Sequence, residues 1–166
     1  MECQEGFGSA YLIFDTEYGP FTVTDEVSGE TKTVGQESFL HTYLDLESLF
    51  GVCPPKITFS FDNGPAPLLE VSMFTRGQVP DWVQRWQPTA EKADLLVLAT
   101  HPDDELIFFG GTIPTHAVER EKSVVVAYMS GASAARRSEL LNGLWHCGVR
   151  DYPEMPRNEF ADVYPA

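Results

Sequence analysis

The second half of the chain is best understood from Asp94-Leu95-Leu96-Val97-Leu98-Ala99-Thr100-His101-Pro102-Asp103-Asp104-Glu105. The continuous apolar run after Asp94 is typical of a strand buried on both faces of a parallel sheet. Residues 103 to about 119 favour a helix, and residues 123–129 form a second apolar run. Residues 133–147 favour a second helix, which Gly148 ends. This strand–helix–strand–helix order predicts part of a Rossmann-like parallel α/β domain.

The first half of the chain has short apolar stretches separated by turn residues, and this pattern predicts antiparallel strands. The predicted strands are residues 11–14, 21–24, 31–34, 57–61 and 69–74. Residues 40–50 are compatible with an amphipathic helix or with a strand. Turn signals about every ten residues favour an antiparallel β-sandwich. The strand pattern resembles jelly-roll modules attached to carbohydrate-active enzymes.

Two domains are therefore expected. Residues 1–88 are predicted to be the jelly-roll-like β-sandwich, a carbohydrate-binding-like module, and residues 89–166 the Rossmann-like part. Pro80, Trp82, Trp86 and Pro88 indicate a connector between them. The two tryptophans favour an interdomain contact over a sugar-stacking platform.

Composition excludes several classes of function. The 166 residues include 11 Lys and Arg against 25 Asp and Glu, a net charge of −14, which excludes nucleic-acid binding through a basic patch. No apolar run reaches the ~20 residues that a membrane-spanning helix needs. The sequence after Met1 has no signal-peptide pattern, and two locations stay open: cytoplasmic, or secreted if a segment precedes this chain. Cys3, Cys53 and Cys147 are scattered and predict neither a disulfide framework nor a cysteine zinc site.

The motif His101-Pro102-Asp103-Asp104-Glu105 lies at the carboxyl end of the first predicted parallel strand, the edge where ligands bind in open α/β sheets. We expect His101 and Asp104 to converge on one divalent cation, as zinc sites require. Asp103, beside them, is placed to act as general base toward a water molecule activated by that cation. A helix start is the alternative, because aspartates cap first turns. That alternative explains one aspartate but not His101.

A resemblance extends this interpretation. The motif is followed by Gly110-Gly111-Thr112, then a buried strand, then Arg136-x-x-Glu139 with Gly143 and Gly148 beyond. Residues 93 to about 150 thereby resemble the LmbE-like or PIG-L family of zinc-dependent N-acetylglucosamine de-N-acetylases. The resemblance implies that His101 and Asp104 bind zinc, that Asp103 is the general base and that Arg136 contacts the sugar. It also implies hydrolysis of the acetamide of an N-acetylated amino sugar or glycoconjugate, which releases acetate and a free amine.

One departure from the family qualifies this expectation. The family completes its zinc ligands with a histidine well downstream, whereas this chain stops at Ala166. His41, His116 and His146 are expected to be structural, so the chain is expected to carry the first half of the catalytic domain, to bind zinc weakly and to turn over little substrate. The alternative is a non-catalytic glycan-binding or interaction protein with a vestigial hydrolase segment.

Overall fold

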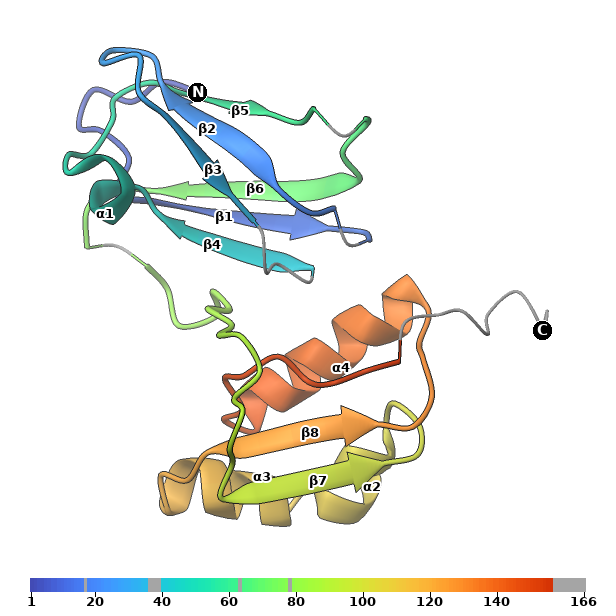
Figure 1. Cartoon of the computed structure of the whole chain (residues 1–166). Helices are drawn as coiled ribbons and strands as arrows, with labels where there is room; N and C mark the ends of the chain where they lie inside the picture. The colour runs from blue at the N-terminus through green and yellow to red at the C-terminus, as the bar shows by residue number, and fades with distance from the viewer. Residues whose placement is uncertain (17, 36–39, 63, 78, 157–166) are drawn as a thin grey trace. The chain divides into compact units, whose positions relative to one another are not determined.

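The computed structural model describes residues 1–16, 18–35, 40–62, 64–77 and 79–156. The chain divides into two compact units, Met1–Arg85 and Trp86–Ala166 (Figure 1). We describe each unit by itself. The predicted boundary at residues 88 and 89 lies three residues beyond the observed division.

The described residues of the first unit form two three-stranded antiparallel sheets. One has the order β4-β1-β6, and the other has the order β3-β2-β5. The bounds are β1 Ser9–Phe14, β2 Phe21–Asp25, β3 Thr31–Val34, β4 His41–Asp45, β5 Ile57–Ser60 and β6 Leu68–Phe74. The antiparallel strands predicted for this half are confirmed.

Both sheets contribute to one hydrophobic core. On β1, Ala10, Leu12 and Phe14 alternate with residues that point to the opposite face, and all three are buried. From β2, Phe21 and Val23 are buried in the same cluster. The alternation of apolar residues on each strand therefore explains why these two sheets share a core.

The segment 40–50 combines both structures that its sequence allowed. It forms strand β4 and then helix α1, Leu46–Phe50. The Asp45 carboxylate accepts a hydrogen bond from the Ser48 N–H at 2.9 Å and caps the helix. Gly51, with φ of 71°, ends it.

The two connector tryptophans each pack inside their own unit. Trp82 contacts Tyr11 and Phe74 edge-on, with ring centroids 5.9 and 6.0 Å away. Trp86 stacks on Tyr152 and contacts Trp145, at 5.4 and 5.5 Å. These aromatic contacts thus lie within one unit each, and the Trp82 side chain remains 54% exposed.

A buried histidine in the first unit makes its stability depend on pH. His41 on β4 is 5% exposed, and its Nδ1 is hydrogen-bonded to the Tyr11 hydroxyl at 2.5 Å. Burial lowers the pKa of His41 from 6.5 to about 4, because the charged imidazolium is poorly solvated there.

We expect the free energy of unfolding to fall by about 3 kcal/mol between pH 6.5 and pH 4 through this residue. In that window the unfolded chain takes up the proton and the folded chain does not, so stability is complete above pH 6.5. Urea denaturation across this range measures the effect. His41→Gln should remove this slope and His116→Gln should keep it; a slope that survives His41→Gln would assign the effect to another group.

The second unit is built on a small parallel sheet. Strands β7, Leu95–Ala99, and β8, Val124–Tyr128, pair in parallel. This confirms two parallel strands where the apolar runs predicted them. Glu154 lies along the other edge of β8, where it accepts a hydrogen bond from the Tyr128 N–H and donates one to Val126, each at 2.9 Å.

The helical content predicted for residues 103 to about 119 is confirmed, but these residues do not form one continuous helix. The chain forms α2, Asp104–Phe109, then the short α3, Thr112–Pro114, then the π-helical turn η1, Thr115–Glu119. Pro114 has no N–H and cannot donate to the carbonyl of Gly110, so the hydrogen-bond ladder is interrupted there. The two adjacent glycines, Gly110 and Gly111, weaken the helix at the same point.

The second predicted helix is confirmed as α4, Ala134–His146. Beyond it, the Val149 N–H donates to Leu144 and the Gly148 N–H donates to Trp145, the pair of bonds that defines a Schellman ending. Gly148 has a φ of 88°, and a Cβ there would lie 2.4 Å from the Val118 side chain. Glycine is therefore required at this position for both conformation and space.

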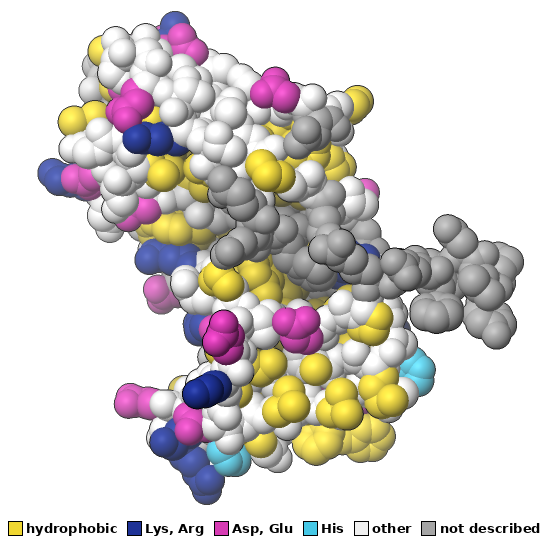
Figure 2. Space-filling model, viewed as in Figure 1, with side chains coloured by type: hydrophobic (Ala, Val, Ile, Leu, Met, Phe, Trp, Pro, Cys, Tyr) yellow, Lys and Arg dark blue, Asp and Glu magenta, His cyan; other side chains and the backbone are white. Residues whose placement is uncertain are grey.

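One face of strand β7 is exposed among the described residues, whereas Val125, which pairs with Leu96 on β8, is buried. Leu96 and Leu98 on β7 are 63% and 60% exposed, whereas Val97 and Ala99 on the other face are buried. Figure 2 shows hydrophobic side chains gathered on the second unit in this view. This patch is unusual, because strands of parallel sheets are normally covered on both faces.

None of the described helices has the length and apolar character needed to cross a membrane.

Candidate metal and substrate site

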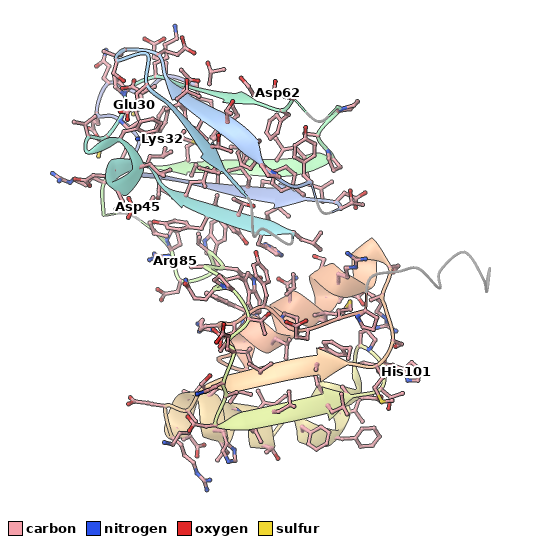
Figure 3. All side chains as sticks on the ribbon, viewed as in Figure 1. Glu30, Lys32, Asp45, Asp62, Arg85 and His101 are labelled. Atoms are coloured by element: carbon pink, nitrogen blue, oxygen red, sulfur yellow. The ribbon has the colours of Figure 1, made fainter. Side chains whose placement is uncertain are left out.

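The motif residues lie at the carboxyl end of the parallel sheet. Strand β7 ends at Ala99, and helix α2 begins at Asp104. Two hydrogen bonds extend the pairing past the strands, from the Met129 N–H to Ala99 at 2.9 Å and from the Ser130 N–H to Thr100 at 3.1 Å. These bonds fix the start of the loop that carries His101, which projects past the end of β7 (Figure 3).

The structure brings the two predicted metal ligands together. His101 Nδ1 lies 3.7 Å from Asp104 Oδ2, and the two side chains are 67% and 23% exposed. Two ligands each about 2.0–2.1 Å from a tetrahedral zinc ion would lie about 3.4 Å apart. Asp104 Oδ2 also accepts a hydrogen bond from the His101 N–H at 3.0 Å, which holds the carboxylate beside the imidazole. The pair therefore fits two positions of a zinc site.

The other histidines lie elsewhere. His116 Nδ1 is 2.9 Å from the Thr112 carbonyl, and its Nε2 is 3.2 Å from the Arg120 guanidinium. His146 is in the last turn of α4, and His41 belongs to the first unit. Across the described parts of the chain, no three His, Cys, Asp or Glu side chains are grouped so that they could hold a metal ion. The described residues thus bring together two side chains that could hold a metal ion, whereas a catalytic zinc usually has three protein ligands.

Asp103 adopts a backbone conformation that L-residues rarely take. Its φ is 143° and its ψ is −26°. Such a conformation costs about 1–3 kcal/mol and persists only where the surroundings impose it. The Asp103 carboxylate makes no capping hydrogen bond to α2. Helix capping therefore does not account for this residue.

Arg136 in the first turn of α4 faces Asp103. Its Nη2 is 3.8 Å from Asp103 Oδ2, and its Nη1 donates to Glu139 Oε2 at 3.2 Å. A pocket of about 90 Å³ lies between these elements. It is lined by Pro102, Asp103, Glu105, Leu106, Arg136, Glu139 and Leu140. The topology thus brings the predicted base and the predicted sugar-binding residue to one pocket.

Carboxylates outnumber cations around this pocket. Asp103, Glu105 and Glu139 line it together with Arg136. Asp104 adds a further carboxylate beside the neighbouring His101. This charge balance favours a divalent cation over an anion at the site.

Sequence reasoning gave Glu105 no role. It is completely buried, whereas its neighbours Ile107 and Phe108 are 67% and 70% exposed. Tyr128 lies close by: burial raises the pKa of its phenol, and the Glu105 carboxylate raises it further. In α2 a charged residue is thus buried while apolar residues are exposed. The apolar run that follows Glu105 is the one sign of this in the sequence, because it leaves α2 without an ordinary amphipathic pattern.

No protein-family model matches this chain, and no curated protein or solved structure matches it either.

Proposed function

We propose that the chain carries the metal and substrate site of a zinc-dependent hydrolase that removes the N-acetyl group from an N-acetylglucosamine-type substrate. One observation carries the proposal: the 3.7 Å approach of His101 to Asp104 at the carboxyl end of β7, with Asp103 and Arg136 at the adjoining pocket. The resemblance of the motif to the LmbE-like or PIG-L family supports the choice of substrate.

His101 and Asp104 are the residues that would hold the metal. When bound, zinc would act as a Lewis acid that polarises the amide carbonyl and lowers the pKa of a bound water molecule. The Asp103 carboxylate is 46% exposed, so a water molecule can reach it. Asp103 would take a proton from water while the water oxygen forms a bond to the amide carbonyl carbon. It would then pass this proton to the nitrogen as the C–N bond breaks, which gives acetate and a free amine.

Arg136 is the proposed substrate-binding residue. Its guanidinium carries several N–H donors in a fixed plane, which suits the hydroxyl and carbonyl oxygens of a sugar. The contact with Glu139 restrains its direction. The location of a cation in the first turn of α4 is unfavourable for the helix dipole, which supports a functional reason for it.

The finer fold assignments are part of this proposal. The second unit is the Rossmann-like first part of the deacetylase domain, and the first unit is a jelly-roll-like, carbohydrate-binding-like module. A second candidate is a glycan-binding or interaction protein with a vestigial hydrolase segment. It is favoured by the presence of only two grouped ligands among the described residues.

Zinc titration combined with an amine-release assay tests the proposal. We expect a single zinc ion to bind, His101→Ala to weaken binding by about tenfold or more, and His116→Ala to leave it unchanged. Amine release from N-acetylglucosamine derivatives should require zinc. It should also be slow, because the described site has two ligands for the metal ion. Zinc binding that is unaffected by His101→Ala would contradict the proposal. Binding of the sugar without amine release, with or without zinc, would support the second candidate.

A further inference from the structure

Glu105 is a buried carboxyl group without a described ion-pair partner. Its side chain is completely buried in the first turn of α2. One polar neighbour is the Tyr128 side chain on β8, which is itself buried. Such a group is costly to bury unless its interactions perform a task. The location directly beneath the pocket suggests what that task is.

The other carboxylate oxygen holds the backbone of Asp103. Glu105 Oε2 accepts a hydrogen bond from the Asp103 N–H at 2.9 Å. The angle φ describes rotation about the bond between N and Cα. At Asp103 the N–H is held toward Glu105 on one side of this bond, and the following peptide is held in α2 on the other side. Together these two restraints fix the φ of 143°. This hydrogen bond is therefore a direct restraint on the rare conformation.

The restraint determines where the Asp103 side chain lies. With the N–H turned toward the buried Glu105, the Asp103 carboxylate lies at the pocket, 3.8 Å from Arg136. We propose that Glu105 is a positioning residue, which holds Asp103 in its strained conformation and so directs its carboxylate into the pocket. Its part in catalysis rests on the proposed function; its effect on the Asp103 backbone does not.

Hydrogen exchange of the Asp103 amide, followed by NMR on the zinc-free chain, tests the restraint without any activity. Glu105→Leu removes the acceptor and should accelerate exchange of this amide by about 10- to 100-fold. Glu105→Gln keeps an acceptor of the same size and should restore slow exchange. Tyr128→Phe is the matched control, because it removes the other polar neighbour of Glu105 and should leave the Asp103 amide protected. Unchanged exchange in Glu105→Leu would overturn the proposal.

Measurements that keep Glu105 decide the matter if Glu105→Leu does not fold. Glycine takes positive φ without strain, so Asp103→Gly alone should raise the melting temperature, and the amide at position 103 should stay protected because the Glu105 acceptor is still present. Fast exchange of this amide in the unchanged chain and in Asp103→Gly would mean that Glu105 does not hold it, and the proposal fails. If Asp103 is protected as expected but zinc and substrate do not bind, the positioning holds and the proposed function fails.

Discussion

Asp103→Asn is expected to lower kcat for zinc-dependent amine release by about 10²- to 10⁴-fold, the usual contribution of a general base. Asparagine has nearly the same size but cannot accept the proton of the attacking water. The affinity for zinc should stay close to that of the unchanged protein, because the proposed ligands are His101 and Asp104. Single-turnover assays at high protein concentration, with detection of the freed amine, measure the ratio even where turnover is slow.

A carboxylate at the other end of the same strand provides the control. Asp94 accepts a hydrogen bond from the Ser123 N–H at 3.1 Å, before β7 begins. Asp94→Asn should leave kcat unchanged. An unchanged kcat in Asp103→Asn would remove the proposed base, and a parallel loss of zinc binding would make Asp103 a ligand instead.

Leu12→Ala is expected to lower the free energy of unfolding of the first unit by about 2–5 kcal/mol. Leu12 is completely buried, and it lies on β1, the central strand between β4 and β6. A strand with a neighbour on each side cannot move to fill the space that the lost methyl groups leave, so the cavity term adds to the lost burial. Urea denaturation followed by far-UV circular dichroism measures the change.

Leu69→Ala is the matched control on a neighbouring strand of the same sheet. Leu69 on β6 is 66% exposed, so its truncation should change the free energy of unfolding by about 0.5 kcal/mol or less. Equal effects of the two substitutions would show that Leu12 does not belong to the core between the two sheets.

The sequence predicts the parts of the fold that repeat a simple period. Alternating apolar residues located the antiparallel strands, and two continuous apolar runs located β7 and β8. Gly148 marked the end of α4, because a left-handed residue is needed there. Periodicity did not separate strand from helix over residues 40–50, since both are present and the Asp45 cap divides them.

Helix propensity predicts that the segment between Asp103 and Glu119 is helical, but it does not predict where the helix is interrupted. The break between α2 and η1 follows from the N–H that Pro114 lacks, although the surrounding composition favours a helix.

The site was partly predictable from topology. A strand end and the following helix start must lie together, which places His101 near Asp104, and the next helix starts at the same edge, which places Arg136 near Asp103. The burial of Glu105 beside Tyr128 and its hydrogen bond from the Asp103 N–H depend on tertiary structure, which no local pattern encodes.

Zinc-edge anomalous diffraction from crystals of the zinc-loaded protein would locate the metal ion itself. We expect an anomalous peak about 2.0–2.2 Å from a ring nitrogen of His101 and from a carboxylate oxygen of Asp104. A zinc ion bound elsewhere, with no peak between these two side chains, would contradict it.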